Sequence, residues 1–546
     1  MKQDYFHSKL VSDYRGSAKS MCMPMSFLFH WWMILFLASC VMLGTCSKNN
    51  PTKPEEMDDG SDLTIRYIQR LPQIDYVWNS NNPAVEGWPA VGQEVTWQAH
   101  VVNWADHKRN SVTYAWFLDG EQIAAGAVDI SACSEVTIDL SWFWTFDRHE
   151  VMFVLDPANT FTEDEERNNQ RAFFTDALTV GFYVEQSLYD YFRKHQHKLN
   201  IGSVTFDDWA HRQIDRLNEM FANAIYPTSP AGVLDRVRID KITVVPDGAL
   251  PLAPLDKIPP EDASPWSHPN VNDRTVDMQW GFPTDALSIF ENRFSVNENN
   301  PFYFHGTLLH ELGHARYLTD VYAFRILHGV NGDSVLIKEN EVPIVGTSYM
   351  PGSIVHYSGP RGDEVGLILY RTNIKGLMNK TYTYIDQHSA AALNLIAGNR
   401  AVCGNYNEPC NIGKYLNDLP AENRLTIHTP DGKILAGANV QIFQALGDPG
   451  ASTFYTRRID DVPDIYLMTD NQGQILLGHN PFSSDQICQD WEVANTTAII
   501  RVEHEGRVGY SFLDVSLFNL AYWEGYTDLA DYKMTFQLFD SVASFK

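Results

Sequence analysis

Cysteine is scarce in this chain, and no two cysteines are spaced as Cys-x-x-Cys. Paired thiolates at that spacing are a usual signature of zinc bound by cysteine, so a thiolate zinc site is not expected. Three of the seven cysteines, Cys22, Cys40 and Cys46, lie near the N-terminus. Cys403 and Cys410 are close enough in sequence to form a small disulfide loop, which a compartment outside the cytoplasm permits.

Positive charge is also in short supply. Lys and Arg number 41 against 68 Asp and Glu, which gives a formal net charge of −27. So acidic a surface would repel phosphates, and this argues against nucleic acid as a partner. Hydrophobic residues make up 44% of the chain and aromatic residues 12%, many of them in strand-like runs. This composition predicts a globular protein rich in β-structure.

The 546 residues are too many for one ordinary domain, and no repeat in the solenoid range is present. At roughly 150 residues per domain, the length suggests three or four. The predicted layout is multidomain, with an α+β domain between two all-β sandwiches. In chain order it comprises a leader or membrane anchor at 1–46, a flexible tether at 47–62, a sandwich at 63–176, the α+β domain at 177–410 and a second sandwich at 411–546.

One long apolar run extends from Ser26 to Leu43, and basic residues precede it. This order is typical of an export signal. Leu37-Ala38-Ser39-Cys40 resembles a bacterial lipobox, whose cysteine is lipidated, and Cys46 is an equal candidate because a polar segment follows it at once. The run also approaches the ~20 residues of a plain signal anchor. Each alternative predicts a chain exported to the bacterial cell envelope and held at the membrane.

Residues 63–176 form short alternating runs separated by turns, which predicts an Ig-like sandwich. The predicted strands are Val95–Asn103, Thr113–Leu118 before the hairpin turn Asp119-Gly120, Val136–Leu140 and Glu150–Leu155.

This segment resembles the bacterial cell adhesion related domain family, abbreviated CARDB. The matching features are Val91-Gly92, Asn103, Leu118-Asp119-Gly120, Asp156-Pro157-Ala158-Asn159, Glu163, Glu166 and Asn168-Asn169. The resemblance implies an accessory module. Its acidic end could hold Ca²⁺ or form a solvated loop, since carboxylates alone do not define a calcium cage.

Residues 310 to 314 read His-Glu-Leu-Gly-His within a segment of helical apolar spacing. The helix is expected to begin at Asn300 and Pro301. His310 and His314 would project from one face and could bind one zinc ion at about 2.0–2.1 Å. Glu311, roughly 100° around the helix, could serve as general base on a zinc-activated water. The motif also arises by chance, so the surrounding sequence must indicate whether it forms a metal site.

His310, His314, Tyr317 and Asp320 have a spacing that resembles the metzincin zinc peptidases, in the variant with aspartate as the last ligand. The resemblance implies a zincin-like domain with Asp320 as third ligand. The family has glycine where this chain has Tyr317, and glycine lets the chain turn sharply back to the metal. Tyrosine could occupy a less sharp turn. Alternative third ligands come from later segments: Glu339, Glu341, Glu364 and His328.

Metzincins also place a methionine turn beneath the metal, and Gly376-Leu377-Met378-Asn379 is the candidate here. A helix with Asp386 as its cap is expected to follow. Met350 is the alternative, and either methionine could simply fill a core. Tyr382 or Tyr384 could stabilise the developing oxyanion or serve in packing.

Strand signals return from about residue 420. Leu425–His428, Ala438–Phe443 and Ile475–Leu477 are separated by turns at Pro430-Asp431-Gly432 and Thr469–Gly473. This pattern resembles prealbumin-like sandwiches of the carboxypeptidase regulatory type, which carry no chemistry.

The sequence therefore predicts an exported, membrane-tethered zinc metallopeptidase with endopeptidase action on a protein or peptide substrate. The alternative is a non-catalytic adhesion or binding lipoprotein with a degenerate zincin-like domain. His310, Glu311 and His314 count against this alternative, because all three together are needed only for chemistry.

Overall fold

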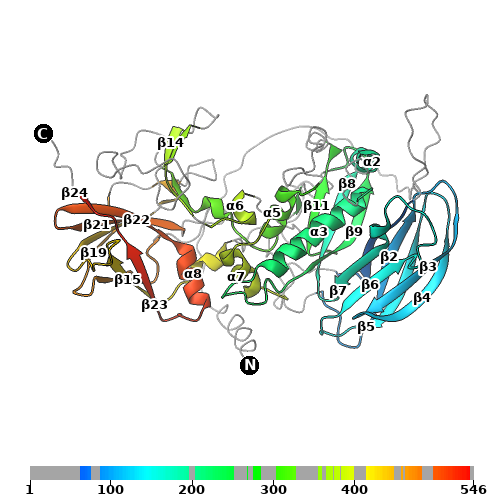
Figure 1. Ribbon diagram of the computed structural model, residues 1–546, viewed down its shortest axis with the longest axis horizontal. Coiled ribbons are helices and arrows are strands. Elements are labelled where there is room, and N and C mark those ends of the chain that lie inside the picture. Colours follow the sequence, from blue (N-terminus) through cyan, green and yellow to red (C-terminus); the bar gives the residue numbers. More distant parts are fainter. Residues whose placement is uncertain are drawn as a thin grey trace, which may run out of the picture. The chain divides into compact units, whose positions relative to one another are not determined.

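The computed structural model (Figure 1) describes most of the chain between Asp62 and Asp540. The described residues are 62–74, 87–195, 203–250, 267–268, 273, 275–284, 303–327, 355–358, 365–372, 374–380, 383–398, 413–444, 446–447, 457–458, 462–482 and 496–540. The predicted leader lies outside them, as do Cys40, Cys46, Cys403 and Cys410. Within these ranges no helix is long and apolar enough to cross a membrane.

The first part of the described chain is a β-sandwich of two antiparallel sheets, in the orders β1-β2-β5 and β4-β3-β6-β7. Its strands are β1 (Leu63–Leu71), β2 (Glu94–Asn103), β3 (Arg109–Leu118), β4 (Glu121–Ile130), β5 (Ser134–Phe143), β6 (Glu150–Leu155) and β7 (Gln170–Phe174), with the 3-10 helix η1 (Glu166–Asn169) before β7. Each predicted strand is confirmed.

Apolar side chains from both sheets fill the space between them. Trp97 on β2 and Trp116 and Phe153 on β3 and β6 are fully buried in one cluster. The predicted hairpin joins β3 to β4, and Asp119 and Gly120 have φ angles of 50° and 83°. Two successive positive φ angles match the twist of antiparallel strands, which is why an Asp-Gly pair occupies this turn.

The central part has a sheet in the order β10-β11-β8-β9, in which all neighbouring strands are parallel. Its elements are β8 (Leu178–Glu185), α2 (Gln186–His195), α3 (Phe206–Asn223), β9 (Val237–Val245), β10 (Ser267–His268) and β11 (Met278–Phe282). Helix α3 begins with a capping box formed by Thr205 and Asp208, which satisfies two otherwise unpaired N–H groups. Its apolar face, including Trp209 and Leu217, is buried in the main core.

Short elements follow this sheet. They are α5 (Gly306–His314), η5 (Val321–Ala323), β12 (Arg325–Leu327), β13 (Val355–Ser358), β14 (Val365–Arg371), α6 (Leu377–Lys380), α7 (Gln387–Leu395) and η6 (Lys414–Asn417). The three strands pair in the order β12-β14-β13. Asp386 caps α7, as predicted, by accepting a hydrogen bond from Ser389 N.

The motif helix begins later than predicted. Asn300 and Pro301 lie outside the described residues, and α5 starts at Gly306 with His305 as its cap. His305 Nδ1 accepts a hydrogen bond from Leu308 N at 3.0 Å, and its own backbone N–H donates to Gln213 Oε1 at 2.8 Å. Burial lowers the pKa of His305 to about 4, so the ring stays neutral and can accept this hydrogen bond. A capping histidine was not anticipated because the usual caps are Ser, Thr, Asp and Asn.

The last part contains three further sheets, in the orders β20-β15-β23, β19-β16-β21-β22-β24 and β17-β18. Its elements are β15 (Glu422–His428), β16 (Asn439–Gln444), β17 (Leu446–Gly447), β18 (Arg457–Arg458), β19 (Ile465–Met468), β20 (Gln474–Leu476), β21 (Thr497–His504), β22 (Arg507–Asp514), α8 (Val515–Trp523), β23 (Leu529–Thr535) and β24 (Phe539–Asp540). The predicted strands are confirmed, whereas nothing in the sequence analysis anticipated α8.

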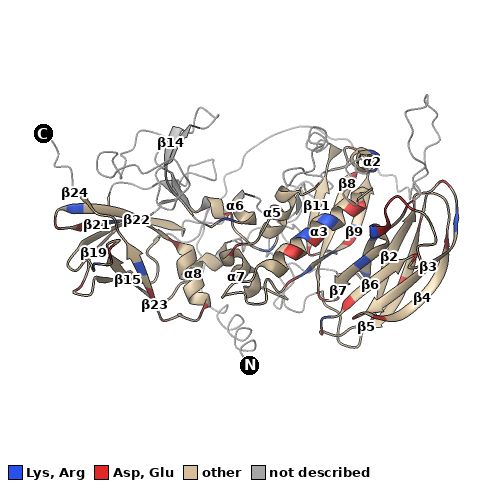
Figure 2. Cartoon of the chain, viewed as in Figure 1, with Lys and Arg blue, Asp and Glu red and all other residues tan. Residues whose placement is uncertain are grey.

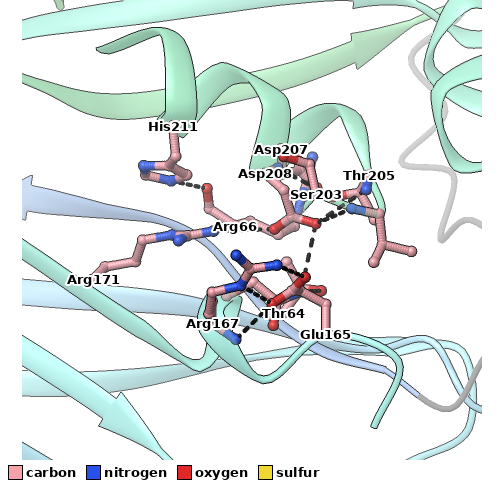
Figure 3. Close-up of polar contacts among 12 residues, drawn as sticks. Thr64, Arg66, Glu165, Arg167, Arg171, Ser203, Thr205, Asp207, Asp208 and His211 are labelled. Atoms are coloured by element: carbon pink, nitrogen blue, oxygen red, sulfur yellow. Dashed lines mark hydrogen bonds and ion pairs between the residues drawn. The ribbon is translucent and has the colours of Figure 1, made fainter. Parts of the chain in front are cut away.

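Buried side chains of the central and last parts form one continuous hydrophobic cluster, which Tyr67 of β1 also joins. The first sandwich adds polar contacts to α3 (Figure 3). Arg66 on β1 binds Asp207 Oδ2 through Nε at 3.2 Å, and His211 Nε2 lies 2.7 Å from the Arg66 carbonyl. The described chain is mainly β-sheet.

Candidate metal centre

Three predicted ligands lie together. His310 and His314 on α5 and Asp320 just before η5 have ligand atoms that all lie within 4.8 Å of one another. Asp320 Oδ1 lies 2.9 Å from His310 Nε2 and 3.3 Å from His314 Nε2. All three side chains are buried. Among the described residues, no other trio of His, Cys, Asp or Glu brings its ligand atoms this close.

Backbone carbonyls orient both imidazoles. His310 Nδ1 lies 2.9 Å from the Leu377 carbonyl, and His314 Nδ1 lies 2.7 Å from the Leu318 carbonyl. A carbonyl can only accept, so Nδ1 must carry the proton in each ring and Nε2 presents its lone pair to the centre. A histidine ligand typically has such an outer partner on its second nitrogen.

The carboxylate of the third ligand, Asp320, tests whether a cation fits the site. Asp320 Oδ1 is buried, yet no described group forms a hydrogen bond of good geometry with it, although two imidazole nitrogens are near. Burial would raise the pKa of Asp320, but in the metal-free site the hydrogen bonds and positive charge of His310 and His314, which act when the rings are protonated, lower that pKa well below its usual range. An ionised carboxylate and two imidazole lone pairs at one buried point are a suitable donor set for zinc.

The turn after α5 is sharper than predicted for tyrosine. Tyr317 has a φ of 67°, the left-handed conformation that glycine would adopt there. Leu318 N donates to Gly313 O at 3.2 Å and Tyr317 N donates to His314 O at 2.8 Å. This pair of hydrogen bonds is a Schellman motif, which reverses the chain after a helix. Tyr317 therefore does not use the less sharp turn that a tyrosine could occupy, and it makes the glycine-like turn that returns Asp320 to the histidines.

The predicted methionine turn lies against the motif helix. Met378 is fully buried, and a Cβ added to Gly313 would lie 2.6 Å from its Sδ. The same turn supplies the Leu377 carbonyl that orients His310. Leu377 N in turn donates to the Tyr384 carbonyl at 2.9 Å. The structure thus places this segment against α5 and in contact with His310.

The remaining candidates are placed less directly. Glu311 is half-buried on α5, between the two histidines in sequence. Tyr384 is 41% exposed and joins the site through its backbone carbonyl. Several alternatives lie outside the described residues: Tyr382, Met350, Glu339, Glu341, Glu364 and His328.

Tyr322 is a neighbour of the centre that the sequence analysis missed. Its ring is nearly parallel to that of His310, with an interplanar angle of 13° and centroids 6.1 Å apart. Tyr322 follows Asp320 by two residues, and this proximity to a predicted ligand is the signal that could have identified it.

The acidic end of the first sandwich uses its carboxylates within the loop. Asp156 accepts hydrogen bonds from Thr160 Oγ1 at 2.7 Å and Phe161 N at 2.9 Å. Glu163 accepts from Leu63 N at 2.7 Å and Asn169 Nδ2 at 3.1 Å. Burial, with like charges nearby, raises the pKa of Glu163 to about 7. Calcium binding there remains a prediction.

One family model matches part of the first sandwich. The CARDB family model matches residues 75–173, so this part of the chain is a CARDB domain, as predicted. One similar structure is the CARDB domain of the PF1109 protein from Pyrococcus furiosus in complex with di-metal ions, which is 20% identical, covers 21% of this chain and 92% of that chain, and has a TM-score of 0.17. Another is a putative cell surface protein from Methanosarcina acetivorans, 18% identical, covering 21% and 90%, with a TM-score of 0.15. A search of curated proteins finds no match.

Proposed function

We propose that this chain is a zinc-dependent peptidase, in which residues 177–410 form a zincin-like domain between the CARDB domain and the C-terminal sandwich. The observation that carries the proposal is the buried convergence of His310, His314 and Asp320, with Glu311 on the same helix. We further propose that the protein is exported and held at the cell surface by the predicted leader. The CARDB domain supports this setting, since one similar protein is named a putative cell surface protein.

The residues of the centre have different roles in hydrolysis. A bound zinc ion supplies Lewis acidity, which polarises the scissile carbonyl and makes an attacking water more acidic. His310, His314 and Asp320 hold the ion. Glu311 accepts the proton of the attacking water on its carboxylate and delivers it to the leaving amine. Burial of the three ligands limits the access of competing water to their ligand atoms.

Zinc content and hydrolysis together test this function. Purified protein should contain one zinc per chain and cleave unfolded casein, and His314→Ala should lose the zinc. Glu311→Gln should retain zinc while kcat falls about 10²–10⁴-fold, the usual contribution of a general base. Glu121→Gln, an exposed change on β4, is the matched control and should leave both quantities unaltered.

Full hydrolysis by zinc-loaded Glu311→Gln would contradict the assigned mechanism. Stoichiometric zinc without hydrolysis of casein or of a peptide library would instead favour the non-catalytic surface lipoprotein.

A further inference from the structure

The turn that positions Asp320 forms hydrogen bonds with residues outside α5, the helix that carries the two histidines. Gly413 N, immediately before η6, donates to the Tyr317 carbonyl at 3.0 Å. Thr319 N donates to the Tyr415 hydroxyl at 3.1 Å. Thr319 directly precedes the third ligand, so η6 fixes the chain on both sides of Leu318. Neither contact belongs to α5 or to the methionine turn.

Helix α8 of the C-terminal sandwich in turn holds η6. Asn519 is fully buried, and its Nδ2 donates to the Tyr415 carbonyl at 3.2 Å and to the Asp418 carbonyl at 2.9 Å. Trp523 Nε1 donates to Asp418 Oδ2 at 3.0 Å. A buried amide that satisfies two carbonyls ending a short 3-10 helix leaves that helix little freedom to shift, because each unpaired carbonyl would be costly.

The same helix packs on α7, beside it in Figure 1. Neither α7 nor α8 contains Lys, Arg, Asp or Glu, so both helices are drawn in tan in Figure 2. His388 on α7 lies 3.1 Å from Asn519 Oδ1 through Nε2 and stacks on Trp523 with centroids 5.3 Å apart. Asn519 therefore joins α7, α8 and η6 at one buried point.

We propose that the C-terminal sandwich completes the metal centre, with Asn519, Trp523 and Tyr415 as positioning residues that fix Asp320 for the metal. The contacts run from Asn519 to Tyr415, from Tyr415 to Thr319, and from Thr319 along the chain to Asp320. This inference rests on the proposed zinc site but not on hydrolysis. The C-terminal sandwich is then a structural part of the centre.

Zinc affinity of the full-length chain tests the inference. Tyr415→Phe deletes only the oxygen that accepts the Thr319 hydrogen bond, and it should raise the zinc Kd about 10-fold, since partners of metal ligands typically contribute 10–100-fold. Asn519→Ala should raise the Kd at least as much. Tyr532→Phe is the matched control, because it removes a hydroxyl bonded to Asn423 Oδ1 within the same sandwich, and its Kd should stay within about twofold.

Two further readouts separate positioning from general stability. The visible spectrum of the Co²⁺-loaded chain should change in Tyr415→Phe, because the carboxylate ligand is less well oriented, and stay unchanged in Tyr532→Phe. The melting temperature of zinc-free Tyr415→Phe should match that of Tyr532→Phe.

An unchanged Kd and cobalt spectrum in Tyr415→Phe would overturn the inference, even if Asn519→Ala fails to fold. Tight zinc binding without peptide hydrolysis in the wild type would reject the proposed function and leave the inference standing. A wild-type chain that binds no zinc would contradict both.

Discussion

Tyr317 has a backbone conformation that favours glycine, with its side chain buried in the main core. A non-glycine residue with positive φ carries about 1–2 kcal/mol of strain. The turn persists because its Schellman hydrogen bonds and the Gly413 contact hold it. The aromatic ring then contributes packing that a glycine could not.

Substitution at Tyr317 should separate turn geometry from packing. Tyr317→Gly should lower the free energy of unfolding by a few kcal/mol, because a buried ring is lost. Its zinc Kd should stay within about threefold, because glycine adopts the same φ. Tyr317→Val should weaken zinc binding at least 10-fold, because a β-branched residue resists positive φ. Equal zinc Kd values for the two variants would show that this backbone turn does not place Asp320.

Gly313 and Met378 should behave as a coupled pair. Gly313→Ala brings a Cβ to 2.6 Å from Met378 Sδ, and overpacking of a core typically costs about 1–3 kcal/mol, part of which a better helix propensity offsets. In the double variant with Met378→Ala the added methyl has room. In urea unfolding, the double variant should therefore lose less free energy of unfolding than the two single variants lose in sum. Strict additivity would mean that the two side chains do not compete for space.

At the level of elements, helices α7 and α8 pack together, and His388 and Asn519 form a polar contact between them. Burial lowers the pKa of His388, although nearby Asp386 opposes this effect. The unfolded chain takes up a proton near pH 6.5, whereas the folded chain resists it. The unfolded state therefore binds more protons below that pH, and stability falls as the pH drops from about 6.5.

His388→Phe should reduce this acid sensitivity. Phenylalanine can stack on Trp523 but cannot be protonated, so the difference in unfolding free energy between pH 7.5 and pH 5.0 should shrink. The chemical unfolding should be done on zinc-free protein. Metal that is lost when its ligands are protonated at low pH then does not contribute to the pH dependence. His107→Phe is a suitable control because His107 is exposed. An identical pH dependence in wild type and His388→Phe would contradict the assignment.

Sequence patterns account for the elements more fully than for the contacts between them. The four-residue spacing of His310 and His314 predicts two side chains on one helical face, and alternating apolar runs predict the strands. The hydrogen bond from Thr319 to Tyr415 joins residues far apart in the chain, and no periodicity encodes it. Tyr317 shows a different difficulty, because residue type alone does not favour positive φ and only the surrounding hydrogen bonds make it possible.

On the scale of the whole molecule, an ion pair and buried hydrogen bonds tie strand β1 of the first sandwich to the central sheet and helices. Arg66 binds Asp207 on α3 and Glu135 on β5, the latter at 2.8 Å. Arg70 N donates to Asp240 Oδ1 at 3.2 Å, and Arg238 donates to the Ile68 carbonyl at 3.0 Å. Because several of these groups are buried, separating the domain would leave charges without partners.

Removing one partner should uncouple the domains. Asp207→Ala leaves Arg66 without its α3 partner, and breaking a buried pair costs about 3–5 kcal/mol. Calorimetry should show one main transition for these parts in the wild type and an earlier, separate transition in the variant. Asp129→Ala, which removes an exposed pair with Lys108, should leave the profile unchanged. A single unshifted transition in Asp207→Ala would argue against tight coupling.

The support of Asp320 by α8 has a consequence for the order in which the molecule is made. His310 and His314 leave the ribosome together with Asp320, but Asn519 and Trp523 follow much later. A nascent or prematurely terminated chain would possess all three ligands and still lack the contacts that hold the third in place. Firm retention of metal would then mark a chain whose synthesis has passed α8, and damaged fragments would release their zinc.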